Sequence, residues 1–241
     1  MRRTLEFLVV LAAVAVVVVF LNRDTKELEP KPTAAATAAP VQTATPDADA
    51  SVEFPSALVP LPDKTNVPAL TKTRTVRVET SEGNFQLEIY PEAAPNAAER
   101  FIKLVEIGYY DGIPVSRVVE DFVVQFGINS KMVEWKDNNF KDDPSLFQLL
   151  PGTIAFAKAG PDTNSTQVFI NLRENNRLAD PNMNFTVFGR VTDGMEVVQS
   201  FRQVGDLAGG LDQVRLWEDG DAYLESLEEK PSGITRMVVV E

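Results

Sequence analysis

The chain has 241 residues, 44% of them hydrophobic, so it is long enough for one or two domains and can bury a substantial core. Its 23 Lys+Arg against 35 Asp+Glu give a net charge of −12, which argues against electrostatic binding to nucleic acid or to anionic lipid. The chain has no cysteine and no histidine, which excludes disulfides, thiolate metal sites and every mechanism that needs a Cys or His side chain. Carboxylate-only sites remain open, but Asp142-Asp143 lacks the spacing of a calcium loop, and we expect neither a metal nor a cofactor.

Residues 1–21 predict a transmembrane signal anchor. Arg2 and Arg3 precede an apolar run whose only charge is Glu6. From Thr4 to Leu21 the run has 18 residues, about 27 Å as a helix, which is enough to cross a thin hydrocarbon layer. A signal peptide that is removed is the alternative, but no Ala-x-Ala cleavage site follows directly. The two arginines hold the N-terminus in the cytoplasm, so we expect the rest of the chain outside.

Residues 22–73 predict a disordered, Pro/Ala/Thr-rich linker. They contain 8 of the 16 prolines, and such a composition cannot bury enough apolar surface to offset the entropy lost on ordering. Treated as a flexible coil, the linker would hold the following domain on the order of 40 Å from the membrane. A few apolar residues are the exception and are expected to dock on the domain: Phe54, Leu58, Val59 and Leu61.

Residues 74–241 predict one globular domain of short strands. Alternation at Val76 and Val78, turn residues at 81–84 and renewed alternation from Phe85 are typical of a β-hairpin. Pro95 then opens a helix that ends at Gly108. Later elements are expected as strands at 115–119, 122–126, 153–157, 168–172 and 186–191, a helix at 195–203 and a last strand at 237–240. Many short strands with two helices favour a closed antiparallel barrel with helical caps over a βαβ repeat.

One loop and the strand after it indicate the rim of a binding site. The stretch Ala157–Ile170 runs from a turn-rich Gly-Pro-Asp-Thr-Asn loop into an apolar strand, and Gln167 is the last polar residue before that strand. An amide at this place suggests a hydrogen-bonding group aimed into an apolar pocket. The alternative is a solvated loop followed by a core strand, and this stretch alone does not decide between the two.

Three ordered motifs resemble the cyclophilin-type peptidyl-prolyl isomerases. They are Gly112–Gly127 (GIPVSRVVEDFVVQFG), Gly152–Ile170 (GTIAFAKAGPDTNSTQVFI) and Phe185–Val191 (FTVFGRV) followed by Gly194-Met195. Further stretches resemble a bacterial-type branch of the family: Gln125–Ile128, Lys141–Pro144, Asp212–Arg215 and Ala222–Glu225. The resemblance covers roughly residues 75–205 and implies a mostly β fold, a closed eight-stranded antiparallel β-barrel capped by two α-helices.

The resemblance also implies a function: acceleration of X-Pro bond rotation in proline-containing polypeptides during folding. Together with residues 1–21, the resemblance predicts a bacterial single-pass membrane protein whose domain acts on the periplasmic or extracellular side. We expect a monomer that does not bind nucleic acid. The family's catalytic set corresponds to Arg117, Phe122 and Gln125, with Arg117 donating a hydrogen bond to the twisted prolyl amide. The residues that would bind substrate are Val123, Ala157, Lys158, Ala159, Gln167, Phe169, Leu178 and Phe185. Within that set, residues 157–159 would offer main-chain contacts, and the apolar members would line the proline pocket.

The sequence departs from the family pattern beside the arginine. Val115-Ser116 stands where the family has Phe-His or Phe-Phe, which removes aromatic support and predicts a looser Arg117. Arg177 takes the position of the tryptophan that binds cyclosporin in eukaryotic members, which predicts weak binding of that drug. A second function therefore stays open: a catalytically weak binding module or chaperone for proline-containing segments.

Overall fold

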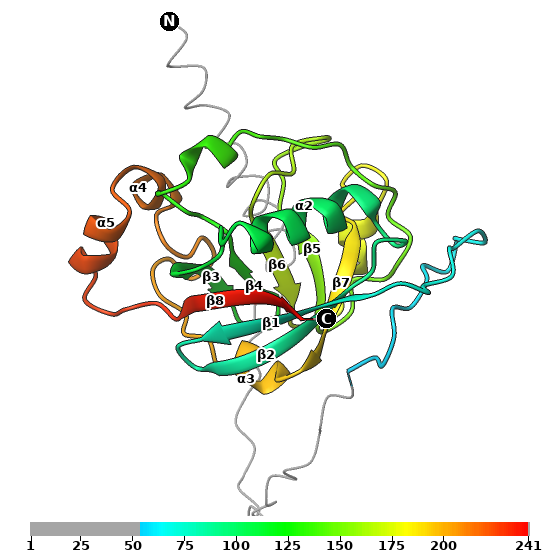
Figure 1. Ribbon diagram of the computed structural model, residues 1–241, viewed down its shortest axis with the longest axis horizontal. Coiled ribbons are helices and arrows are strands. Elements are labelled where there is room, and N and C mark those ends of the chain that lie inside the picture. Colours follow the sequence, from blue (N-terminus) through cyan, green and yellow to red (C-terminus); the bar gives the residue numbers. More distant parts are fainter. Residues whose placement is uncertain (1–53, 241) are drawn as a thin grey trace, which may run out of the picture.

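Eight strands close into one antiparallel barrel in the computed structural model of the chain, which describes residues 54–240 (Figure 1). The order around the barrel is β1-β2-β7-β5-β6-β4-β3-β8. The strands are β1 (Arg74–Thr80), β2 (Gly83–Ile89), β3 (Ile113–Val119), β4 (Val123–Phe126), β5 (Thr153–Phe156), β6 (Val168–Asn171), β7 (Val187–Asp193) and β8 (Gly233–Val240). The predicted barrel is therefore confirmed.

Alternation explains why these residues form strands and where the core lies. In β1, Val76 and Val78 point inward and are fully buried, and β2 buries Phe85, Leu87 and Ile89 in the same way. The hairpin register pairs Val76 with Leu87 and Val78 with Phe85, so apolar partners face one another inside the barrel.

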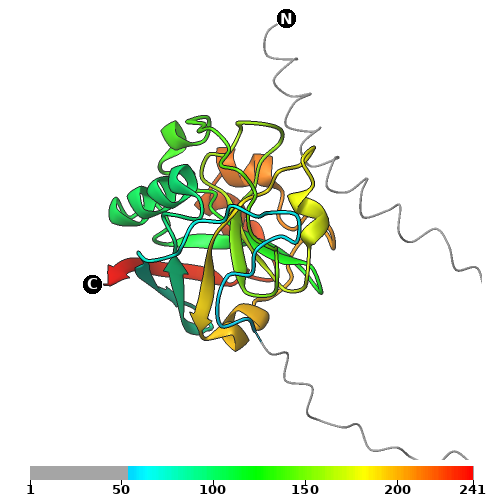
Figure 2. The same cartoon turned by 90° about the vertical axis from the view of Figure 1, so that its right-hand side faces the viewer.

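Between residues 54 and 240, four α-helices accompany the barrel, where two were expected. Helix α2 (Pro95–Glu106) and helix α3 (Met195–Gln199) lie on opposite sides of it in both views, as predicted for the caps (Figures 1 and 2). Helices α4 (Gln213–Glu218) and α5 (Asp221–Ser226) lie to one side, in a region that the sequence pattern left unassigned. Two short 3-10 helices, η1 (Val133–Trp135) and η2 (Asn176–Ala179), complete the described elements.

The helix pair α4–α5 has a small core of its own. That core consists of buried residues from the pair, from the chain that leads to it and from the segment after β4: Ile128, Val204, Leu211, Leu216, Trp217 and Tyr223. It is separate from the barrel interior.

Residues 54–72, called here the N-terminal strap, pack against the barrel and cross one of its faces (Figure 2). Leu58 and Leu61 are buried, as expected, whereas Val59 is 37% exposed. The backbone N–H of Leu61 donates to Leu146 (2.9 Å), and that of Gln148 donates to Val59 (2.8 Å). The packed domain thus includes residues on the N-terminal side of the expected boundary at residue 74.

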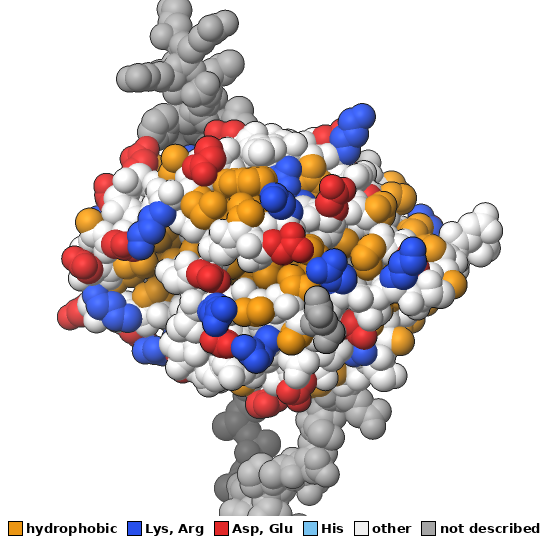
Figure 3. All heavy atoms as spheres, in the orientation of Figure 1, with side chains coloured by type: hydrophobic (Ala, Val, Ile, Leu, Met, Phe, Trp, Pro, Cys, Tyr) orange, Lys and Arg blue, Asp and Glu red, His pale blue; other side chains and the backbone are white. Residues whose placement is uncertain are grey.

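The predicted anchor, residues 1–21, and the predicted linker up to residue 53 lie outside the described residues. Between residues 54 and 240, no helix combines the length and the apolar character needed to cross a bilayer. On the face shown in Figure 3, acidic and basic side chains are interspersed with apolar ones.

Candidate active site

Three neighbouring strands bring a row of polar side chains together. Arg117 on β3 pairs in register with Gln125 on β4, and Gln167 immediately precedes β6. The Nη1 of Arg117 donates to the Oε1 of Gln125 (3.3 Å), whose Nε2 donates to the Oε1 of Gln167 (2.9 Å). We call Arg117, Gln125 and Gln167 the polar row. The structure thus joins three residues that the sequence analysis had named separately.

The Arg117 guanidinium is held on several sides and is only 6% exposed. Its Nε donates to the carbonyl oxygen of Ala208 (2.5 Å), and its Cζ lies 5.7 Å from the centroid of the Phe122 ring. Burial lowers the pKa of Arg117 to about 10, against the opposing effect of the Asp206 charge, so the group stays protonated at neutral pH. Its Nη2 is buried and has no hydrogen-bond partner among residues 54–240.

An apolar wall lies next to the polar row. Its buried members are all residues predicted for the site: Phe122, Val123, Phe169 and Leu178. The partly buried Phe185 packs on them, with its ring edge-on to Phe169 at 5.7 Å between centroids. Phe185 also donates its backbone N–H to the carbonyl oxygen of Leu178 (2.9 Å). This wall offers the ring of a proline an apolar surface directly beside the arginine.

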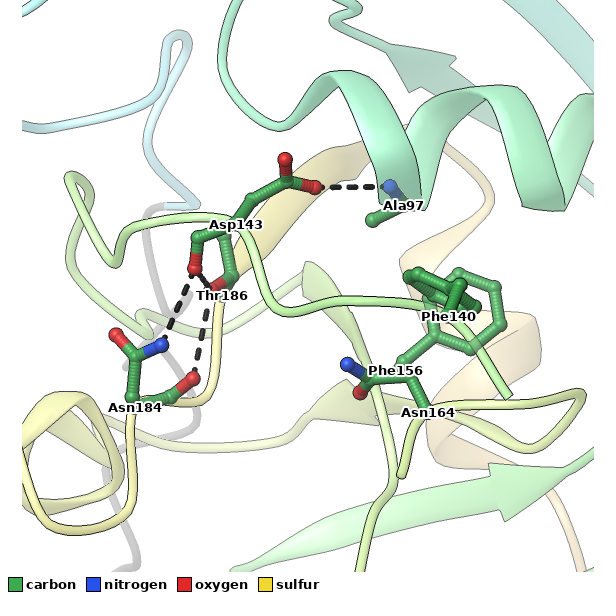
Figure 4. A pocket seen from close by; sticks show the side chains of 7 residues that line it. All are labelled: Ala97, Phe140, Asp143, Phe156, Asn164, Asn184 and Thr186. Atoms are coloured by element: carbon green, nitrogen blue, oxygen red, sulfur yellow. Dashed lines mark hydrogen bonds between the residues drawn. The ribbon is translucent and has the colours of Figure 1, made fainter. Parts of the chain in front are cut away.

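The neighbours of Phe185 in the chain, Asn184 and Thr186, line the small pocket shown in Figure 4. There the carbonyl oxygen of Asp143 accepts from Thr186 Oγ1 (2.7 Å) and Asn184 Nδ2 (3.2 Å). The carboxylate of Asp143 accepts from the N–H of Ala97 (2.9 Å) and so caps the first turn of α2. Burial raises the pKa of this carboxyl, and its backbone hydrogen bonds oppose that shift. Asp143 therefore holds the two residues that flank Phe185 in the chain and joins them to the start of α2.

Lys158 has a role that the sequence analysis missed. Its side chain is only 3% exposed and forms an ion pair with Asp142. Its Nζ also donates to the carbonyl oxygen of Asn184 (3.1 Å) and lies 5.5 Å from the centroid of the Phe185 ring. Only the main chain of Lys158 was predicted to take part in the site. Its buried ammonium also connects Asp142 to Asn184 and Phe185, and so to the apolar wall.

The other two predicted main-chain contacts lie at the end of β5. Ala157 packs against the apolar wall and donates its N–H to Gln167 (2.9 Å). Ala159 is exposed on the loop and donates its N–H to Thr163 Oγ1 (3.0 Å). Contacts of these residues with a substrate stay a prediction.

Comparison with known proteins agrees with this arrangement. A family model described as "Cyclophilin type peptidyl-prolyl cis-trans isomerase/CLD" matches residues 75–216, which include every member of the polar row and the wall. The chain belongs to this family. It is therefore a peptidyl-prolyl cis-trans isomerase of the cyclophilin type, and the resemblance inferred from the three motifs is confirmed at that level.

Relatives match over the same region. "Peptidyl-prolyl cis-trans isomerase-like 1" of Rhizopus delemar is 34% identical over 136 residues, 54% of this chain and 81% of the relative. "Peptidyl-prolyl cis-trans isomerase ppi1" of Schizosaccharomyces pombe is 36% identical over 128 residues, 51% of this chain and 81% of the relative. A crystal structure of a cyclophilin type isomerase of Cryptosporidium parvum, obtained in the presence of the dipeptide Ala-Pro, shares the fold. Its TM-score is 0.53 at 21% identity, covering 69% of this chain and 99% of the other. The bacterial-type branch stays a prediction.

Proposed function

We propose that this cyclophilin accelerates X-Pro rotation by donating a hydrogen bond from Arg117 to the prolyl nitrogen as the amide twists. The uncatalysed barrier is about 18–20 kcal/mol, because rotation removes the resonance of the peptide bond. As resonance is lost, the nitrogen becomes pyramidal and its lone pair can accept a hydrogen bond. A donor that meets this lone pair binds the twisted amide more strongly than the planar one, which is the condition for catalysis.

The observation that supports the proposal is the unequal use of the Arg117 nitrogens. Nε and Nη1 donate to Ala208 and Gln125, while Nη2 is buried without a partner among the described residues. A buried donor without a partner costs about 1–3 kcal/mol, so a ligand group that accepts from it is favoured. The apolar wall beside it, with Phe122 and Phe169, fits a proline ring.

The reaction on this proposal needs no proton transfer and no covalent step. The absence of histidine and cysteine from the chain is therefore no obstacle. An increase from about 0.01 to about 1,000 per second corresponds to roughly 7 kcal/mol of preferential binding to the twisted amide. One preorganised charged donor supplies about 3–4 kcal/mol of such a sum, and the apolar wall and the amides of Gln125 and Gln167 would have to supply the rest.

The test is the cis/trans exchange rate of an Ala-Pro peptide, measured by NMR with wild type and Arg117→Ala. Wild type should accelerate exchange, and Arg117→Ala should be slower by about a hundredfold or more. Equal acceleration by both proteins would show that the arginine has no such role. A wild type that binds the peptide without accelerating exchange would instead support the second function, a binding module for proline-containing segments.

We also propose that residues 1–21 anchor the enzyme and that it acts outside the cytoplasm. The support is the apolar run from Leu5 to Leu21, whose only charge is Glu6, after Arg2-Arg3. Mass spectrometry of the protein extracted from membranes tests the anchor, because a mature N-terminus beyond Leu21 would refute it.

A further inference from the structure

The segment Gly205–Gln213, called here the clasp, contacts the polar row in its middle and at its C-terminal end. In the middle, the carbonyl oxygen of Ala208 accepts from the Nε of Arg117 (2.5 Å). At the C-terminal end, the Oε1 of Gln213 accepts from the Nε2 of Gln167 (3.4 Å). The clasp is therefore the one described segment outside the barrel strands and their ends that hydrogen-bonds to two members of the polar row.

The clasp also lies directly on the backbone that carries Arg117. The N–H of Leu211 donates to the carbonyl oxygen of Ser116 (2.9 Å). Beside it, a Cβ atom at Gly210 would lie 2.4 Å from that same oxygen and 2.7 Å from the Cα of Arg117. Because Gly210 also has a φ of +72°, only glycine fits both the space and the backbone conformation at this contact.

Internal hydrogen bonds fix the turn that presents Ala208. The Oδ1 of Asp206 accepts from the N–H of Ala208 (2.9 Å) and of Gly209 (2.7 Å). Asp206 and Gly210 exchange two backbone hydrogen bonds of 2.8 Å each. The two N–H groups, and then the charge of Arg117, lower the pKa of Asp206, so its carboxylate stays ionised at neutral pH. The hydrogen bonds of Asp206 thus fix the turn in which the Ala208 carbonyl oxygen faces Arg117.

The far end of the clasp is attached to the helix pair α4–α5. Asp212 caps α4 by accepting from the N–H of Val214 (3.0 Å), and its own N–H donates to the hydroxyl of Tyr223 (3.0 Å). Leu211 belongs to the small core that also holds Trp217 and Tyr223. The clasp therefore connects the helix pair α4–α5 to Arg117.

We propose that the clasp is a positioning element of the isomerase: it holds the Nε edge of Arg117 at Ala208, so that Nη2 stays directed at the substrate amide. It takes the place of the aromatic support that Val115-Ser116 lacks, since Ser116 is buried under Leu211 and Gly210. The residues Asp206, Ala208 and Gly210 act through Arg117 and do not touch the substrate. This proposal rests on the proposed role of Arg117.

Two substitutions at Asp206 separate positioning from simple stability. Asp206→Ala removes the acceptor that closes the turn, whereas Asp206→Asn keeps an oxygen in the same place. We expect Asp206→Ala to slow exchange of the Ala-Pro peptide by about tenfold with little change in peptide affinity, because a loosened donor loses transition-state contact first. Asp206→Asn should stay within about twofold of wild type.

A double-mutant cycle then asks whether Asp206 acts through the arginine. In the Arg117→Ala background, Asp206→Ala should cause no further loss, because the group that it positions is gone. The cycle is repeated with Gly210→Ala, which pushes the clasp off Ser116, and with Gly233→Ala as the matched control. A Cβ at Gly233 would meet only the oxygen of Ile113, at an ordinary 3.7 Å, so this variant should behave as wild type.

The outcomes distinguish this proposal from the function that it rests on. An inactive wild type overturns the proposed function and the positioning role with it. An active wild type with an equally active Asp206→Ala and Gly210→Ala overturns the positioning role alone. The positioning role would also be overturned if the loss of activity caused by Asp206→Ala or Gly210→Ala added to the loss caused by Arg117→Ala. The same holds if Asp206→Asn lost as much activity as Asp206→Ala. Either result would reflect a general structural effect.

Discussion

Replacing Lys158 by methionine is expected to destabilise the domain by about 3 kcal/mol, because it leaves the buried Asp142 carboxylate without its cation. The two side chains are only 3% and 13% exposed, so solvent screens the pair weakly. Removing one partner of a buried pair costs about 3–5 kcal/mol, and the low end applies because Asp142 keeps a hydrogen bond from Asn164 Nδ2 (2.6 Å). Methionine retains most of the apolar stem, so the loss reports on the charge.

The assay is urea and thermal unfolding of the domain with its N-terminal strap. A loss of about 3 kcal/mol should lower the Tm by about 6–12 °C in a domain of this size. The matched control is Lys131→Met, because Lys131 pairs with Asp221 at 2.8 Å with both side chains more than 60% exposed. That variant should change stability by less than about 1 kcal/mol.

Removing both charges of the buried pair should restore part of the lost stability. The double variant Lys158→Met/Asp142→Asn leaves no unpaired ion, and we expect a coupling energy of about 2 kcal/mol in the cycle. Lys158→Met should also slow exchange of the Ala-Pro peptide, since Phe185 loses its cation and Asn184 its donor. If Lys158→Met is no more destabilising than Lys131→Met, or if the cycle is additive, the reasoning about this pair is refuted.

Two further predictions concern pH and the N-terminal strap. The catalysed exchange rate should be constant from about pH 6 to about pH 8, because a pKa of about 10 leaves Arg117 at least about 99% protonated there. The rate should fall as the pH rises through about 10. A step in the NMR rates between about pH 6 and about pH 8 would mean that the titration of another group controls the site. Leu58→Ala should lower the free energy of unfolding in urea by about 2–3 kcal/mol, because the Leu58 side chain is buried in the same cluster as the apolar wall. The neighbouring Val59 is 37% exposed, so Val59→Ala should lower it by less than about 0.5 kcal/mol. Equal losses at these two positions would contradict a docked strap.

The barrel strands could be predicted because their signal is local. The alternation at Val76 and Val78 and again from Phe85 to Ile89 needs only neighbouring residues, and the structure has β1 and β2 there. Helices α4 and α5 gave no comparable signal, since each has six residues, too few for a clear 3.6-residue period. Their packing depends on a small core whose members are spread from Ile128 to Tyr223.

The site could be predicted as a set of residues but not as a connected array. Family motifs placed Arg117, Gln125 and Gln167 in the site, while their hydrogen bonds follow from the pairing of β3, β4 and β6. The clasp was beyond sequence reasoning for another reason. Gly205 to Gly210 indicates a turn, but turn chemistry does not say against which surface the turn will lie.

The position of β8 in the barrel has a consequence for how the enzyme comes to be active. This strand inserts between β1 and β3, so residues 233–240 complete a ring whose other members were all synthesised earlier. Until they arrive, β3 has a bare edge on the side away from β4, and β3 carries Arg117, the residue proposed to act on the substrate amide. The barrel must therefore close late, through contacts between distant parts of the chain, which makes slow folding the expectation. The isomerase would therefore have no complete site until the last strand of its barrel has been synthesised and has paired with β1 and β3.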